Sequence, residues 1–205
     1  MATHGIVPDR AASATRGGLA PLARRLRAAG VTANAVTGLG VALSLVGAAL
    51  VAADRPLAAL VVLVVGSVAD TLDGAIARVS GGGTRLGAFL DSTADRVADA
   101  ALFGAAAWLG AWTGDGALLF AALVAMPLSF FVPYVRAKAE SLGVAATVGP
   151  APREARLVVL LAGIAVWALL GLPAAFTTAI VAVAILAAIT FVQRVAAVWR
   201  ALARG

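Results

Sequence analysis

The sequence predicts an all-α integral membrane protein, with six transmembrane helices preceded by an N-terminal amphipathic helix at the membrane interface. Three observations predict this fold class. The 205 residues are 62% hydrophobic and only 13% charged, which is a lower charged share than soluble domains have. Apolar runs of about 20 residues, the length that crosses a bilayer, recur along the chain. Lysine and arginine are concentrated in the loops at alternate ends of these runs, which is typical of loops on the cytoplasmic side of a membrane.

The apolar runs set the expected spans, which cover about residues 35–53, 57–79, 86–110, 114–137, 157–171 and 173–195. Because their number is even, both termini lie on one side, and the positive residues place that side in the cytoplasm. The composition is rich in alanine and arginine and poor in lysine, which is typical of a high-GC bacterium. We therefore expect a multi-pass protein of the bacterial inner membrane.

The N-terminal part is expected to form a flexible tail over residues 1–18, before a single membrane domain over residues 19–205. In LAPLARRLRAAG, residues 19–30, leucines recur at helical spacing with arginines between them, which favours a helix on the membrane surface. The alternative is an ordinary basic flank of the first span. The net charge of +6 indicates contact with anionic lipid and not with nucleic acid. With no cysteine and His4 as the single histidine, we expect neither a zinc site nor a Ser-His-Asp triad.

Four aspartates occur in one stretch of the apolar sequence, where a charge is most costly. Asp70 and Asp73 share one face of the second span, and Asp91 and Asp95 share one face of the third. The turn SGGGT is centred near Gly82. An antiparallel hairpin about this turn brings Asp73 and Asp91 to the same depth, about 10 Å from the helix ends, with the other two a turn deeper.

Converging carboxylates repel one another and lose hydration, so they need positive charge nearby. Arg78 and Arg96 are the nearest candidates, and ion pairing between the helices is one alternative. Two divalent cations, Mg²⁺ or Mn²⁺, would balance the acids better because hard ions prefer oxygen ligands. Sites with two metals also stabilise phosphoryl displacement. The aspartates therefore predict metal-dependent phosphoryl transfer.

This stretch resembles the signature of the CDP-alcohol phosphotransferase family. The signature residues occur at their expected separations, namely Asp70, Asp73, Gly74, Ala77, Arg78, Gly87, Asp91 and Asp95. The resemblance implies six membrane helices, an N-terminal amphipathic helix and a homodimer. It also implies that the first three aspartates hold two divalent metals on the CDP pyrophosphate. Asp95 would complete the second metal site and act as the general base.

The same resemblance implies which residues bind the nucleotide lipid that donates the transferred group. Gly74, Arg78 and Thr84 would contact the CDP moiety. VTANAVT, residues 31–37, is similar to the family's TPN-xx-T motif, with Ala33 in place of the usual proline, and implies that Asn34 and Thr37 help to hold the nucleotide lipid. A helix N-cap at this point is compatible with that role.

Positive residues at three places predict a pocket for a phosphorylated acceptor. They lie at the cytosolic end of the fourth span, at the start of the fifth and within the last, and they are Arg136, Lys138, Arg153, Arg156 and Arg194. Converging cations bind phosphate through charge-assisted hydrogen bonds. The alternative is anchoring by the positive-inside rule, which explains Arg200 and Arg204 well and Arg194 poorly.

This cationic set resembles that of the family's actinobacterial phosphatidylinositol phosphate synthases, although their Glu-Arg-x-Glu-Arg motif reads PREAR at residues 152–156. The resemblance implies transfer of a phosphatidyl group from CDP-diacylglycerol to inositol 1-phosphate, with release of CMP. One alternative is a phosphatidylglycerol phosphate synthase, which uses glycerol 3-phosphate and shares the donor site. Another is a cation transporter, whose acids would extend over more than one helix pair.

Overall fold

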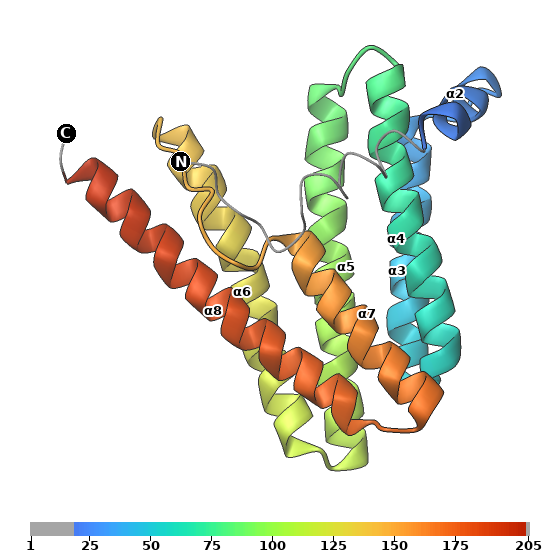
Figure 1. Cartoon of the computed structure of the whole chain (residues 1–205), viewed down its shortest axis with the longest axis vertical. Helices are drawn as coiled ribbons and strands as arrows, with labels where there is room; N and C mark the ends of the chain where they lie inside the picture. The colour runs from blue at the N-terminus through green and yellow to red at the C-terminus, as the bar shows by residue number, and fades with distance from the viewer. Residues whose placement is uncertain (1–18, 204–205) are drawn as a thin grey trace. The chain divides into compact units, whose positions relative to one another are not determined.

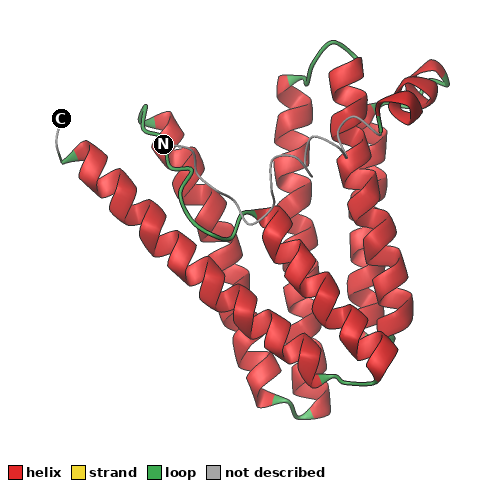
Figure 2. Cartoon of the chain, in the orientation of Figure 1, coloured by secondary structure: helices red, strands yellow, loops and turns green. Residues whose placement is uncertain are grey.

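The computed structural model describes residues 19–203, and within this range the chain is helical and contains no β-strand, as Figure 2 shows. The helices are α2 (Ala20–Ala28), α3 (Ala33–Ala52), α4 (Pro56–Val79), α5 (Arg85–Thr113), α6 (Gly116–Ser141), α7 (Arg153–Leu170) and α8 (Ala174–Leu202). The all-helical fold is thereby confirmed. The expected tail over residues 1–18, with His4, lies outside the described residues, as does Arg204.

Each apolar run of the sequence corresponds to one helix. Four helices, α3, α4, α6 and α8, are long and apolar enough to cross a membrane. The other two expected spans, α5 and α7, carry four of the charged residues that the sequence assigns to function, namely Asp91, Asp95, Arg153 and Arg156. The structure thus describes a membrane protein, and the count of six spans stays a prediction.

The described residues fall into two compact units, one ending at Ala105 and the other beginning at Ala106. The first contains α2, α3, α4 and the N-terminal part of α5. In this unit α3 and α4 run side by side (Figure 1). The second unit contains the end of α5 with α6, α7 and α8, and both α6 and α7 pack against α8. The single domain expected over residues 19–205 stays a prediction.

Glycines bring α3 and α4 into close contact. A Cβ added to Gly47 would lie 2.5 Å from the side chain of Leu63, and one added to Gly66 would lie 3.3 Å from the Cβ of Leu43. Gly40 is buried and faces the Gly66 carbonyl. Small residues at such a contact let two helix backbones approach, which is the usual way that membrane helices associate. This contact fixes which side of α4 faces α3.

Helix α2 is present where the sequence predicts a helix over residues 19–30. Its apolar residues Leu19, Ala23 and Leu26 join a core cluster that includes Ile76 of α4. Its arginines are exposed, and they are Arg24, Arg25 and Arg27. The helix therefore has an apolar face packed on α4 and a basic face, while its position on a membrane surface stays a prediction.

The turn between α4 and α5 is built from glycine and threonine. Gly81 and Gly82 have φ angles of 95° and 112°, a left-handed backbone that glycine adopts without strain. Thr84 then accepts a hydrogen bond from the Gly87 N–H at 2.9 Å, which caps the start of α5. The hairpin turn thus lies where the sequence predicts it, and it brings α4 and α5 together.

The second unit is held by contacts of α7 and α8. A Cβ added to Gly163 of α7 would lie 2.4 Å from the Cβ of Ala179, so these helices also approach closely. Trp167 and Phe176 stack with ring centroids 5.6 Å apart. Gly171 ends α7 in the left-handed conformation, and its N–H bonds the Trp167 carbonyl. The chain can therefore reverse in a short connection.

Asp115 links the start of α6 to α8. It accepts from the Leu118 N–H at 2.9 Å and from the Thr177 hydroxyl at 2.7 Å. These hydrogen bonds, the one from Leu118 first, lower the pKa of Asp115 below its ordinary value of 3.8. The carboxylate is thus an N-cap of α6 and a tie between two helices.

Replacing Asp115 with alanine should lower the stability by about 1 kcal/mol at neutral pH, the usual cost of a lost N-cap. Because the folded-state pKa is lowered, this contribution is present above pH 3.8 and is lost as the pH falls through the folded-state pKa. The measurement is the melting temperature in detergent micelles across a pH series.

Thr113→Val is the matched control, because that hydroxyl bonds the Leu109 carbonyl of its own helix. Its effect should not change with pH. An Asp115→Ala effect that is equally large at neutral pH and at about pH 3 would show that the charge of Asp115 does not carry the contribution.

Candidate functional site

Three carboxylates come together between α4 and α5. Asp70 on α4 and Asp91 and Asp95 on α5 each offer an oxygen atom, and these oxygens lie within 4.8 Å of one another. Asp91 and Asp95 are one turn apart and so point the same way from α5. Oxygens on opposite sides of a Mg²⁺ or Mn²⁺ ion are about 4 Å apart, so this spacing suits one coordination shell. The donor set, carboxylate oxygens alone, fits a hard divalent cation.

Asp73 belongs to the same region and has a different partner. It is buried, with 6% of its surface exposed, and its Oδ2 accepts from the Thr37 hydroxyl at 2.6 Å. Its oxygens are not among the three that lie within 4.8 Å. The sequence predicts that Asp73 and Asp91 meet at one depth. Asp73 is close enough to Asp91 for their charges to interact, and it also accepts the hydrogen bond from Thr37 of α3.

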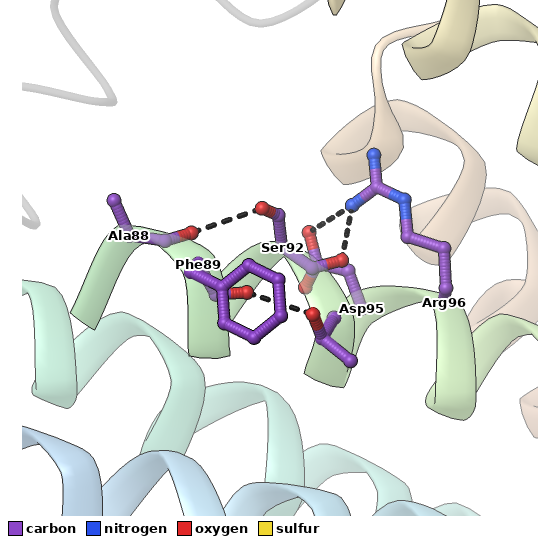
Figure 3. Close-up of polar contacts among 6 residues, drawn as sticks. Ala88, Phe89, Ser92, Asp95 and Arg96 are labelled. Carbon is purple, nitrogen blue, oxygen red and sulfur yellow. Dashed lines mark hydrogen bonds and ion pairs between the residues drawn. The ribbon is translucent and has the colours of Figure 1, made fainter. Parts of the chain in front are cut away.

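A cation lies beside Asp95, as Figure 3 shows. Arg96 Nη1 is 3.6 Å from Asp95 Oδ2, and it also donates to the Ser92 carbonyl at 2.7 Å. The Arg96 side chain is 36% exposed, so solvent weakens this ion pair. Ser92 and Thr93 bond carbonyls one turn back along α5, which leaves those hydroxyls engaged within the helix. The sequence predicts that Arg96 is a cation close to the aspartates, and its contact with Asp95 confirms this.

The predicted donor-binding residues lie in the same unit as the carboxylates. A Cβ added to Gly87 would lie 3.1 Å from Thr84 Oγ1 and 3.4 Å from Asn34 Oδ1, so these polar groups meet at the first turn of α5. A Cβ added to Gly74 would lie 3.3 Å from Arg78 Nη1. The absence of side chains at Gly74 and Gly87 keeps the polar groups beside them accessible.

Two buried arginines lie in the second unit. Arg194 of α8 donates from Nε to the Val148 carbonyl at 3.0 Å and from Nη1 to the Val132 carbonyl at 2.8 Å. Arg156 of α7 donates from Nη1 to the Ala151 carbonyl at 3.1 Å. The arginines are 6% and 4% exposed. Buried charges persist where hydrogen bonds replace water, and these carbonyls provide such bonds.

The other predicted acceptor-binding residues lie near the same helix ends. Arg136 is exposed and pairs with Glu140 at 2.8 Å, one turn along α6. Lys138 is exposed in the last turn of α6, and Arg153 is half-buried at the first residue of α7. Arg136 and Arg156 are close enough to Arg194 for their charges to repel it. At least three of the five predicted cations therefore form one electrostatic cluster.

Comparison with known proteins finds clear relatives. The sequence profile of CDP-alcohol phosphatidyltransferases matches residues 30–203. A phosphatidylinositol phosphate synthase of Mycobacterium tuberculosis is 37% identical over 183 residues, which are 87% of this chain and 84% of that protein. Crystal structures of the M. tuberculosis synthase, one with manganese and citrate and one with CDP-DAG bound, have TM-scores of 0.82 at 36% identity. The matches cover 88% of this chain and 88% and 93% of those chains.

Adding Mn²⁺ or Mg²⁺ to the metal-free protein should raise its melting temperature, because an ion held by three carboxylates binds the folded state. At a metal concentration 100 times the dissociation constant, the gain is about 2.7 kcal/mol. Asp91→Asn should reduce this gain, because it removes one of the three negative charges that would bind the ion. Asp91 is exposed and asparagine has nearly the same shape, so the fold should tolerate this replacement.

Asp54→Asn is the matched control, because Asp54 lies in the α3–α4 turn with φ 57°, a conformation that asparagine tolerates. It should retain the whole metal-induced shift. A melting temperature that does not respond to either metal would rule out a cation site at these aspartates.

Proposed function

The chain belongs to the CDP-alcohol phosphatidyltransferase family, and we propose that it transfers a phosphatidyl group from CDP-diacylglycerol to inositol 1-phosphate. The products are phosphatidylinositol phosphate and CMP. The observation that carries the proposal is the group of Asp70, Asp91 and Asp95, because three carboxylate oxygens within 4.8 Å of one another could hold a divalent metal for phosphoryl transfer. Relatives over most of the chain are phosphatidylinositol phosphate synthases, and a related crystal structure has CDP-DAG bound.

The four aspartates would hold two divalent ions, Mg²⁺ or Mn²⁺, shared among Asp70, Asp73, Asp91 and Asp95. When bound, such ions neutralise the pyrophosphate and stabilise negative charge during phosphoryl displacement. The manganese in a related crystal structure supports this ion chemistry. Thr37 contributes indirectly, since its hydroxyl donates to Asp73 and so orients this buried carboxylate.

In the reaction, an acceptor hydroxyl oxygen forms a bond to the phosphorus that carries diacylglycerol. The bond from this phosphorus to the CMP oxygen breaks, and CMP leaves with the electron pair. Asp95 would accept the proton of the attacking hydroxyl, which is the role that the family resemblance implies for this position. The neighbouring Arg96 places a positive charge 3.6 Å from the Asp95 carboxylate.

The donor would be held by Asn34, Thr37, Gly74, Arg78 and Thr84. Arg78 lies beside Gly74, where it can pair with a phosphate oxygen. Asn34 and Thr84 meet beside Gly87, and their side chains can bond the polar parts of a nucleotide. These contacts lie in the unit that also carries the carboxylates, so donor and metal would be bound together.

The acceptor phosphate would be bound by the cationic cluster, namely Arg136, Lys138, Arg153, Arg156 and Arg194. Arg194 uses two of the five guanidinium donors for the carbonyls of Val132 and Val148. The remaining donors can bond a phosphate. Glycerol 3-phosphate also carries a phosphate, but the relatives are named for inositol phosphate and so favour that acceptor. Family membership likewise disfavours a cation transporter.

The proposal extends to the membrane arrangement. We place α3 to α8 across the bilayer of a bacterial inner membrane, with α2 at the interface, and with the active site and both termini toward the cytoplasm. The exposed arginines of α2 would meet anionic lipid headgroups while Leu19 and Leu26 pack on the helices. We also propose a homodimer, as the family resemblance implies.

Purified protein should release CMP and form lipid product from CDP-diacylglycerol and inositol 1-phosphate, and should not use free inositol. Neutral inositol lacks the phosphate with which these cations would form charge-assisted hydrogen bonds, so it would lose the contacts that hold the acceptor. Lys138→Gln should raise the KM for inositol 1-phosphate several-fold and leave the KM for CDP-diacylglycerol unchanged. The measurement is radiolabelled lipid product from parallel acceptors.

Arg200→Gln is the control for this series, because its exposed side chain bonds the Ala196 carbonyl of its own helix. Product from glycerol 3-phosphate alone would show that glycerol 3-phosphate is the acceptor, and it would leave the proposed carboxylate site unaffected. Product from free inositol alone would refute the phosphate pocket.

Asp95→Asn should reduce kcat by at least about 10²-fold, the scale of general-base catalysis, while CDP-diacylglycerol binding stays close to wild type. Asparagine keeps an oxygen ligand and loses the ability to take a proton. Asp70→Asn should instead weaken metal-dependent donor binding. Single-turnover rates and donor binding measured side by side separate the two effects, and near-normal turnover by Asp95→Asn would remove it as the base.

A further inference from the structure

The connection between α6 and α7, residues 142–152, is held against α8 by polar contacts, one of which comes from Thr190, a residue outside the predicted site set. Thr190 of α8 accepts from the Ala151 N–H at 3.1 Å and donates to the Leu186 carbonyl at 2.8 Å. Thr190 is fully buried, so both bonds are shielded from water. One turn further along α8, Arg194 bonds the Val148 carbonyl. The connection is therefore fixed at two points.

Gly149 allows this close approach. Its φ of 115° lies in the left-handed region, and a Cβ there would lie 2.4 Å from Thr190 Cγ2. Ala146 and Ala151, on either side of it, are fully buried. The connection thus packs onto α8 through a glycine and two alanines, and the methyl group of Thr190 fills the space beside Gly149.

Ala151 connects Thr190 to Arg156 of the cationic cluster through its backbone. Its N–H is held by Thr190, and its carbonyl accepts from Arg156 Nη1 at 3.1 Å. Arg153 begins α7 two residues later. A shift of Ala151 would therefore move the carbonyl that orients the Arg156 guanidinium, together with the start of the helix that carries both arginines.

We propose that Thr190 is a positioning residue for the phosphorylated acceptor, which acts through Ala151 on Arg156. This inference rests on the proposed function and extends it to a residue that does not touch the substrate. The threonine hydroxyl sets the distance between α8 and the connection, and Gly149 makes that distance possible. Thr190 should thus affect acceptor recognition while leaving donor and metal binding unchanged, since those residues lie in the unit that ends at Ala105.

The test compares two threonines of α8 that both donate to a carbonyl one turn back. Thr190 also accepts from Ala151, whereas Thr178 bonds the Ala174 carbonyl and is exposed. Thr190→Val keeps the side-chain shape and leaves the Ala151 N–H without its partner, so the KM for inositol 1-phosphate should rise about tenfold. Thr190→Ser should restore the wild-type KM, and Thr178→Val should not change it.

Three readouts decide the outcome. The KM for CDP-diacylglycerol and the metal-induced melting shift should stay at wild-type values in Thr190→Val. An unchanged acceptor KM, or an equal loss of donor and acceptor use, would overturn the positioning role. If Thr190→Val does not fold, Thr190→Ala provides the same comparison, because it also removes the hydroxyl and adds no atoms.

The wild-type assay separates this inference from the proposed function. If the wild type forms product and the acceptor KM is unchanged in Thr190→Val, or in Thr190→Ala where Thr190→Val does not fold, the positioning role alone is refuted. No product from any phosphorylated acceptor would refute the proposed function, and the inference with it.

Discussion

The mutual repulsion of carboxylates is the constraint on which the first unit depends. Oxygens of Asp70, Asp91 and Asp95 lie within 4.8 Å of one another in a chain that is 62% hydrophobic, so their negative charges repel one another at short range. Arg96 offsets part of this cost from one side. The glycine contacts between α3 and α4 and the glycine turn before α5 keep the helices from separating. The packing thus maintains an arrangement that a divalent ion would relieve.

The cations of the second unit are stabilised in a different way. Arg156 and Arg194 donate to backbone carbonyls of Ala151, Val132 and Val148, so these buried charges are hydrogen-bonded within the chain itself. The acid cluster would be stabilised by a divalent ion, whereas the buried arginines already have backbone partners and keep further donors for a phosphate. Two of these partners, Val148 and Ala151, lie in the connection between α6 and α7. The packing of this connection onto α8 beside Gly149 therefore helps to position the arginines.

The sequence predicted the helices and the gathering of the acids because both follow from regular spacing. Apolar runs set the helix positions, and the hairpin about Gly82 brought Asp70, Asp91 and Asp95 together. Spacing along a hairpin predicts depth but not the rotation of each helix about its axis. The contact of Asp73 with Thr37 could therefore not be predicted from the hairpin alone, because it depends on how α4 packs against α3.

Hydropathy alone does not identify all the helices that carry the residues proposed to bind metal and phosphate. Four helices are apolar enough to cross a membrane, and the two outside this set carry Asp91 and Asp95 in α5 and Arg153 and Arg156 in α7. The same charges that lower the apparent hydropathy of these helices are the groups proposed to bind metal and phosphate. An ionisable group within a bilayer is retained where function or pairing repays its cost. Because α4, α6 and α8 carry further proposed site residues, among them Asp70, Lys138 and Arg194, the two more polar helices hold part of the proposed site and not the whole of it.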